Sequence, residues 1–369
     1  MKLKTFGWTF ALALVLMKPV HAENIYGLKP GKLELKSVGG LAFGPDGILF
    51  IGDAKDARIV AVDVRDVRRG PVTLPEIKGV DQKLAQLLQV KPADVRIQDL
   101  AVNPQTGHVF LAATAEGKSA QIFQIVGGEV QALPANEALI SEVKLPNPAA
   151  DKVVDDGRRS RNHRENAITD IAFYEGRLLV SGMTADKAAS NVWSVHFPFD
   201  AIDPGTTVEF YHAAHGRTED NNPIRTFVPF MIDGKPNLLA GFVCTPLVRI
   251  PLDQLSAKGD ERGKVVGKTV AELGNRNQPL DLIAYKKGGE EFLLLINSAR
   301  GVMKISTDGL AQNPGLVTHV AGGGTAGQTF EPVSDLNGAI QLDKVGDSQA
   351  AILLKREDGS IDFKLVELP

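Results

Sequence analysis

The 369-residue chain has a single cysteine, Cys244, and only 6% aromatic residues. One cysteine excludes an internal disulfide, so the hydrophobic core has to supply the stability. The chain also lacks an excess of basic residues, with 41 Lys and Arg against 44 Asp and Glu. Nucleic acids and anionic membrane surfaces select a basic face, so this composition argues against both as the main partner. Hydrophobic residues make up 43% of the chain, which is ample for a folded domain.

Beyond its N-terminus, the sequence has no apolar run long enough to span a membrane. The chain begins with two lysines, Lys2 and Lys4, followed by an apolar core that ends at Met17 and by the small residue Ala22 at a possible cleavage point. This is the pattern of a secretory signal. We expect cleavage after Ala22, a periplasmic or secreted location, and no membrane insertion of the mature chain. An uncleaved signal anchor is the alternative, although Lys18 and Pro19 end the apolar run short of the roughly 20 residues that a span needs.

The mature part, residues 23–369, carries 38 basic and 44 acidic residues, a net charge of −6, and contains an internal repeat. Each copy has two short apolar runs joined by a turn, most clearly in GGLAFGPDGILFIG at Gly39, and this is hairpin chemistry. Alignment of six copies, at intervals of 59, 71, 56, 55 and 58 residues, makes the following positions equivalent: Gly40, Asp99, Asp170, Thr226, Asp281 and Ala339. Such a period indicates a repeat architecture.

We therefore predict an all-β fold, a single β-propeller of six four-stranded blades over residues 23–369. Residues 32–38 are expected to pair with the C-terminal strand and close the ring. Seven blades, one of them degenerate, is the alternative, because the interval between Asp99 and Asp170 is long. A basic polar insertion accounts for that length better than a further hairpin does. One helical pattern interrupts the strands and places four apolar residues on one face: Val80, Leu84, Leu87 and Leu88.

The first copy, LAFGPDGILFIGD followed by RIVAVD, resembles the NHL-repeat propellers and the related senescence-marker/gluconolactonase-like six-bladed propellers. This resemblance implies a propeller fold. Members of the group include lactone hydrolases, lyases and binding scaffolds, and the fold does not fix the function. The gluconolactonase-like enzymes hold a divalent cation at the channel mouth with a Glu from the first blade, where this chain has Gly39 or Gly40.

Acidic residues and histidines give two candidate metal sites. Three carboxylates stand at matching strand entries: Asp99, Asp170 and Asp281. Together they suit Ca²⁺ or another divalent cation, which takes oxygen ligands; alternatively, each accepts backbone hydrogen bonds and fixes a turn. His212 and His215 with Glu219 suit zinc or copper, although strand alternation predicts that His212 points away from His215.

Arginines are concentrated in loops that we expect to meet at the channel mouth. Their guanidinium groups bind carboxylate or phosphate in a bidentate manner. The candidate ligand-binding residues are Arg164, Arg217, Arg225, Arg276, Arg300 and Asn297. We therefore predict that the exported protein binds a small anionic molecule or a periplasmic partner protein on this face. A metal-dependent lactonase-like hydrolase or lyase with its site at the channel mouth is the alternative, and no catalytic residue is assigned, since Cys244 has no identifiable base.

The signal peptide gives a first testable prediction. When the full chain is expressed in a bacterial host, we expect the exported protein to begin at Glu23, because residues 1–22 are removed on translocation. Cell fractionation and intact-mass measurement check this, with a chain that starts at Glu23 as the cytoplasmic control. A membrane-bound product that retains Met1 would contradict it.

Overall fold

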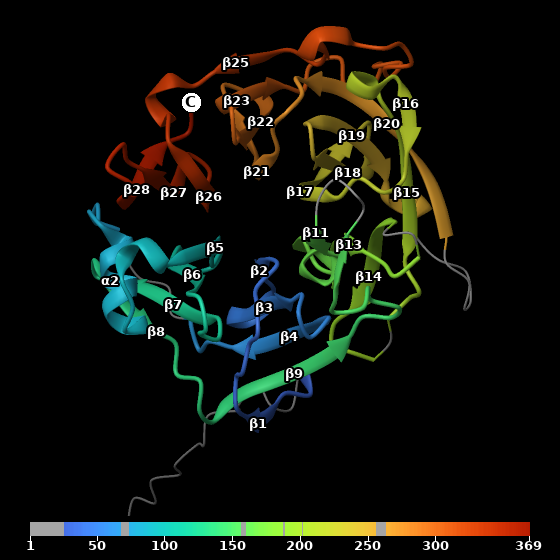
Figure 1. The fold of residues 1–369 in the computed structure, drawn as a ribbon. Coiled ribbons are helices and arrows are strands. Elements are labelled where there is room, and N and C mark those ends of the chain that lie inside the picture. The colour runs from blue at the N-terminus through green and yellow to red at the C-terminus, as the bar shows by residue number, and fades with distance from the viewer. Residues whose placement is uncertain (1–25, 68–73, 156–159, 187–188, 201, 256–262) are drawn as a thin grey trace, which may run out of the picture.

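The computed structural model describes residues 26–67, 74–155, 160–186, 189–200, 202–255 and 263–369. Nearly all regular structure in them is β-strand, and the strands form a ring of sheets (Figure 1). The predicted signal peptide, residues 1–22, lies outside the described residues. No described helix is long and apolar enough to cross a membrane.

In the described part of the chain, six innermost strands stand around the ring, and we number the sheets that they begin by the chain order of these strands. Sheet 1 contains β2 (Leu41–Phe43), β3 (Ile48–Asp53), β4 (Arg58–Asp63), β9 (Ala138–Lys144) and β1 (Lys29–Gly31), and sheet 2 contains β5 (Arg96–Val102), β6 (Val109–Thr114), β7 (Gln121–Val126) and β8 (Glu129–Ala132). Sheet 3 contains β12 (Asp170–Tyr174), β13 (Arg177–Met183), β14 (Ser190–His196) and β15 (Thr206–His212). Sheet 4 contains β17 (Ile224–Ile232), β18 (Lys235–Phe242), β19 (Pro246–Pro251) and β20 (Gly263–Leu273). Sheet 5 contains β21 (Pro279–Lys287), β22 (Glu290–Asn297), β23 (Gly301–Ser306) and β25 (Phe330–Pro332), and sheet 6 contains β26 (Ala339–Val345), β27 (Gln349–Lys355) and β28 (Ile361–Glu367).

The innermost strands close into a ring. β2, β5, β26, β21, β17 and β12 contact one another in that order and return to β2. Adjacent sheets bury apolar faces against each other, as where Phe50 of sheet 1 stacks on Phe173 of sheet 3 with ring centroids 5.5 Å apart. Radial sheets packed in this way define a β-propeller, and the all-β propeller prediction is confirmed.

Sheets 1 and 2 exchange places relative to their order in the chain. After β4 the chain reaches sheet 6, where Ile77 forms an antiparallel bridge with Phe363 of β28. It then builds helix α2 (Val80–Leu88) and sheet 2, and returns as β9 to pair with β4 at the outer side of sheet 1. Sheet 2 consequently lies between sheets 1 and 6, and sheet 1 lies between sheets 2 and 3 (Figure 1).

The predicted ring closure by residues 32–38 and the C-terminal strand is wrong. Leu35 of that segment bridges Ala120, which directly precedes β7, whereas β28 pairs with β27 and with Ile77. The physical reason is that the chain after β4 has already covered the free edge of β28. The N-terminal segment instead packs Leu33 and Leu35 into the core between sheets 1 and 2.

Further strands join sheets 3, 4 and 5. β15 pairs in parallel with the first half of β20, so sheets 3 and 4 are continuous at their outer strands. β16 (Arg217–Glu219) pairs with β15, and β24 (Thr325–Gly327) pairs with β20. The long interval between Asp99 and Asp170 contains β9, used by sheet 1, and the hairpin of β10 (Val153–Asp155) and β11 (Ser160–Asn162).

Helix α2 gives a stability prediction. Its buried residues follow a spacing of four, Val80, Leu84 and Leu88, and pack in the core shared by sheets 2 and 6, whereas Leu87 is 43% exposed. We expect Leu84→Ala to lower the free energy of unfolding by about 2–5 kcal/mol, because it leaves a cavity in this core. Leu87→Ala should change it by about 0.5 kcal/mol or less. Urea denaturation checks both, and equal losses would contradict the assigned packing.

Candidate functional site

The channel is lined midway by the three predicted aspartates. Asp99, Asp170 and Asp281 border both a cavity of about 380 Å³ at one mouth and a cavity of about 340 Å³ on the other side. We call the first the mouth cavity. Its polar lining also includes Gln98, Glu165, Asn166, Arg225, Thr226 and Gln341.

Each of the three carboxylates joins two neighbouring sheets. One oxygen accepts the backbone N–H of the next residue in its own strand, at 2.8 Å in all three cases. The other oxygen accepts a backbone N–H of the adjacent innermost strand. The pairs across sheets are Asp99 with Leu41 at 2.6 Å, Asp170 with Phe227 at 2.8 Å and Asp281 with Leu342 at 2.9 Å. We call this arrangement the carboxylate clasp.

A fourth clasp was missed by the sequence alignment. Asp343 accepts the backbone N–H groups of Lys344 and, across the sheets, of Val102, both at 2.7 Å. The alignment used Ala339 for the last copy, but a β-bulge between Ala339 and Gln341 shifts the register. Corresponding bulges precede Asp99 and Asp281, so Gln341 is the structural equivalent. Asp343 lies two residues after Gln341, so a search of the last copy for an Asp near Gln341 would have found the clasp.

Enclosure by the surrounding sheets raises the pKa of all four carboxyl groups. Loss of water raises the pKa of Asp170 to about 7 and that of Asp343 to about 6. Burial, and then the neighbouring Asp170 and Asp99 charges respectively, raise the pKa values of Asp99 and Asp281 well above the usual range. Gln341 is placed to donate its amide to both, at 3.1 Å from Asp99 Oδ1 and 2.8 Å from Asp281 Oδ2.

The hydrogen bonds of the carboxylate clasp use the same oxygens that would bind a divalent cation at Asp99, Asp170 and Asp281. Backbone N–H groups occupy both oxygens of each carboxylate, which is the bonding expected of a structural device at each strand entry. Among the described residues, three ligand atoms come within 4.8 Å of one another only at His212, His215 and Glu219. Calcium binding by the three aspartates stays a prediction.

The first-sheet position, where gluconolactonase-like enzymes carry a Glu, is occupied by a glycine for a steric reason. A Cβ at Gly39 would overlap the carbonyl oxygen of Ile168, and one at Gly40 would lie 3.0 Å from the Ile171 nitrogen. Sheets 1 and 3 therefore approach each other at backbone distance, and a glutamate at Gly39 has no room.

Arg225 is the predicted ligand-binding residue that lines the mouth cavity. It is the extra residue of a β-bulge between Ile224 and Thr226, a device that redirects a side chain. Its Nη1 donates to Asn166 Oδ1 at 2.9 Å, and within the described part of the chain it forms no ion pair with a carboxylate. Burial lowers the pKa of this guanidinium, and Asp170 opposes the shift.

The other predicted ligand-binding residues do not gather around the mouth cavity. Arg164 donates to the carbonyl oxygens of Ala149 and Lys55. Arg217 binds Glu219, and Arg276 and Arg300 are exposed. Asn297 is buried, and its Oδ1 accepts the N–H groups of the two turn residues Ala299 and Arg300.

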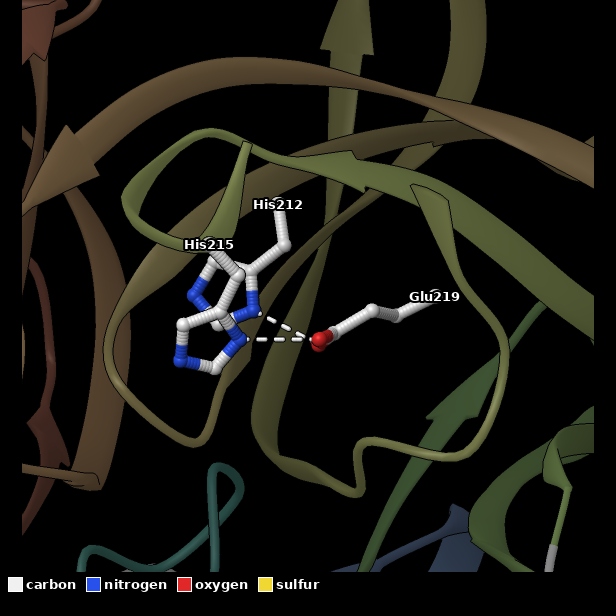
Figure 2. A group of neighbouring side chains, drawn as sticks. All are labelled: His212, His215 and Glu219. Carbon is white, nitrogen blue, oxygen red and sulfur yellow. Dashed lines mark hydrogen bonds and ion pairs between the residues drawn. The ribbon is translucent and has the colours of Figure 1, made fainter. Parts of the chain in front are cut away.

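The two histidines converge, contrary to the expectation from strand alternation. His212 ends β15, and the 3-10 turn Ala213–His215 folds back so that the two rings lie 3.9 Å apart between centroids. Both Nδ1 atoms face Glu219 of β16, at 2.7 Å for His212 and 2.8 Å for His215 (Figure 2). We call these three residues the His–His–Glu cluster. The turn Gly216, with φ of 63°, makes this approach achievable.

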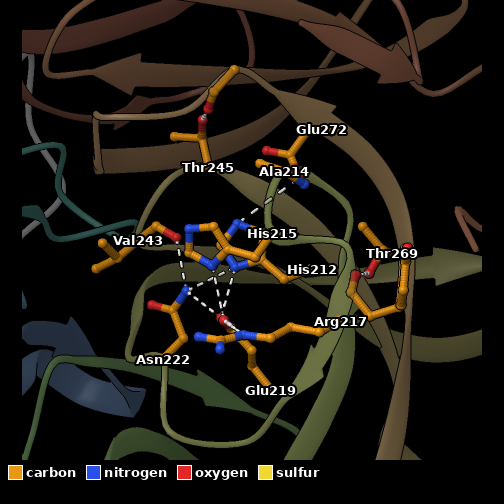
Figure 3. A network of polar contacts seen from close by, with 12 residues as sticks. His212, Ala214, His215, Arg217, Glu219, Asn222, Val243, Thr245, Thr269 and Glu272 are labelled. Carbon is orange, nitrogen blue, oxygen red and sulfur yellow. Dashed lines mark hydrogen bonds and ion pairs between the residues drawn. The ribbon is translucent and has the colours of Figure 1, made fainter. Parts of the chain in front are cut away.

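Further polar groups surround the His–His–Glu cluster (Figure 3). Arg217 Nε donates to Glu219 Oε1 at 2.9 Å, and Asn222 Nδ2 donates to the Val243 carbonyl at 3.0 Å. Despite desolvation, hydrogen bonds from the histidines and Arg217 lower the pKa of Glu219 to about 2. The other ring nitrogen of His212, Nε2, lies near the buried Glu272, and desolvation raises the pKa of that carboxyl group to about 7.

The pKa of Asp170 gives a prediction for stability against pH. Folding raises this pKa from 3.8 to about 7, so the folded chain retains a proton that the unfolded chain releases. The stability advantage of the wild type over Asp170→Asn should therefore be greatest below pH 4 and should fall by roughly 2–4 kcal/mol as the pH rises to 7. Denaturation at several pH values checks this, with the exposed Asp347→Asn as control. A pH-independent difference would contradict it.

Comparisons with known proteins give only distant structural similarity. No family model matches it, and no curated protein matches its sequence. Among solved structures, an oxidoreductase described as a glucose dehydrogenase from Thermus thermophilus is 13% identical, with 92% of this chain and 100% of that one covered and a TM-score of 0.35. The PQQ-bound aldose sugar dehydrogenase of Streptomyces coelicolor is 12% identical, at coverages of 92% and 98% and a TM-score of 0.33. Streptogramin B lyase is 11% identical, at coverages of 92% and 97% and a TM-score of 0.34. The similarity is to propeller-like proteins, at low identity.

Proposed function

We propose that the protein is an exported β-propeller, distantly related to the NHL and gluconolactonase-like propellers, that binds a small anionic ligand in the mouth cavity. The observation that carries this proposal is the position of Arg225, a half-buried cation that lines the cavity and has an amide, not a carboxylate, as its hydrogen-bonding partner. A half-buried guanidinium whose hydrogen-bonding partner is a neutral amide can bind an anion through charge-assisted hydrogen bonds. The cavity volume, about 380 Å³, lies in the range of small-molecule sites.

The remaining lining residues suit a ligand with hydroxyl or amide groups beside its anionic group. Thr226 of β17 and Gln341 of β26 both border the cavity. Asn166 accepts a hydrogen bond from the Arg225 guanidinium. The raised pKa of Asp170, about 7, reduces the negative charge beside Arg225 at neutral and lower pH. A carboxylate ligand therefore meets less repulsion than the number of aspartates suggests.

The alternative, a metal-dependent lactonase-like hydrolase or lyase, receives less support from the same residues. Each of the carboxylates of Asp99, Asp170 and Asp281 already accepts two backbone N–H groups, so a cation would have to share those oxygens with the clasp. The glycine contact at Gly39 also removes the first-sheet ligand of the gluconolactonase-like enzymes.

Substitution of Arg225 tests the proposal. We expect one carboxylate from a panel of mono- and dicarboxylic acids and hydroxy acids to bind with one-to-one stoichiometry in calorimetry. Arg225→Gln should weaken this binding by roughly 10- to 150-fold, since a hydrogen bond to a charged group contributes about 1.5–3 kcal/mol. Arg276→Gln, at an exposed arginine outside the cavity, is the matched control and should bind as the wild type does.

Two results would overturn the proposal. One is the same affinity in Arg225→Gln and in the wild type, which would place the anion elsewhere. The other is no binding by any member of the panel to a folded wild-type protein. Thermal melts of both variants, without ligand, show whether a loss of binding reflects unfolding.

A further inference from the structure

The His–His–Glu cluster has the donor atoms of a transition-metal site. The ligand atoms of His212, His215 and Glu219 all lie within 4.8 Å of one another. Two imidazole nitrogens and one carboxylate oxygen are a ligand set that zinc takes in proteins. Neighbouring ligands of a tetrahedral zinc are about 3.4 Å apart, so the present N–O distances of 2.7 and 2.8 Å need to widen only slightly.

The backbone brings these three residues together before any ligand binds. In the β15–β16 pairing, His212 is opposite Arg217 and Phe210 is opposite Glu219. The turn between the strands carries His215, and its closing residue, Gly216, packs against His319. Because His212 and Glu219 stand on paired strands, the cluster is held in place by main-chain hydrogen bonds.

The surroundings of the second ring nitrogen of His212 are also those of a metal-binding histidine. His212 is fully buried, and its Nε2 has no hydrogen-bonding partner among the described residues. It lies 4.0 Å from Oε2 of Glu272, which accepts the Ala214 N–H, while the buried Oε1 of Glu272 also lacks a partner in that part of the chain. Metal-bound histidines usually donate their other N–H to a carboxylate, and Glu272 stands where that carboxylate belongs (Figure 3).

A cluster held by hydrogen bonds alone explains these contacts less well. If neutral His212 donates its Nδ1 proton to Glu219, its Nε2 becomes an acceptor that faces Glu272, and ionised Glu272 is also an acceptor. A metal on Nδ1 instead fixes the tautomer with the proton on Nε2, facing Glu272. The second oxygen of Glu219 keeps its bond to Arg217, which holds the carboxylate in position.

We propose that His212, His215 and Glu219 bind one zinc ion through the two Nδ1 atoms and the carboxylate, with Glu272 as the hydrogen-bonding partner of His212. The fourth position of the metal is open to water, because the His215 side chain is 40% exposed. The ion joins the end of β15 to β20, which carries Glu272, where sheets 3 and 4 meet. This site is separate from the mouth cavity, whose lining contains none of the three ligands.

Equilibrium dialysis of the untagged protein against Zn²⁺, followed by metal analysis, tests the site. We expect one zinc per chain, an affinity at least tenfold lower in His215→Ala, and unchanged binding in His196→Ala, which removes an exposed histidine of β14. Glu272→Gln should retain the stoichiometry but weaken binding by roughly 10- to 100-fold. Co²⁺ in place of Zn²⁺ should give a visible absorption spectrum that His215→Ala abolishes.

The proposal is overturned if the wild type takes up no stoichiometric zinc, or if His215→Ala binds zinc and cobalt as the wild type does. Should His215→Ala fail to fold in a thermal melt, Glu219→Gln, which preserves the side-chain shape, provides the same comparison. Neither readout depends on the anion proposed for the mouth cavity, and Arg225→Gln should retain full zinc binding.

Discussion

The carboxylate clasp is the interaction on which the channel depends. Four aspartates each hold the backbone of the next innermost strand, and all four act in the same direction around the ring, from sheet 3 to 4, 5 to 6, 6 to 2 and 2 to 1. A buried N–H that lacks an acceptor costs about 1–3 kcal/mol, so each clasp offsets that loss where two sheets diverge. Two of the six boundaries, between sheets 4 and 5 and between sheets 1 and 3, have no clasp among the described residues. At the boundary of sheets 1 and 3 the close backbone contact at Gly39 takes its place.

The ring is closed without a disulfide and, in the described part of the chain, without pairing of the N-terminal segment with the last strand. Strand β9 of sheet 1 follows the strands of sheet 2 in the chain. Ile77, which precedes sheet 2, pairs with the edge strand β28 of sheet 6. Separation of sheets 6 and 2 would therefore expose the core that contains α2 and Phe363, and would also break the Asp343 clasp. The interleaved order of the sheets therefore holds the ring together without a disulfide.

The two proposed binding sites use residues other than the clasp aspartates. One short segment, residues 212–225, leads from the end of β15 into the channel and carries both candidate sites. Its first part holds the His–His–Glu cluster at the junction of sheets 3 and 4, and its last residue is the bulged Arg225 of the mouth cavity. The strong pairing of β15 with β16 and β20 makes this segment a rigid support for both.

The hairpins, the repeat and the all-β propeller could be predicted from the sequence, because alternating apolar residues and turn residues act locally. The sequence also indicated Asp99, Asp170, Asp281 and Arg225 as channel residues. The exchange of sheets 1 and 2, the bulge that hid Asp343, and the convergence of His212 with His215 became visible only in the folded chain. The reason is that these features arise from pairing between distant segments and from one-residue register shifts. A single sequence records which residues suit a strand, but not which strand each one meets.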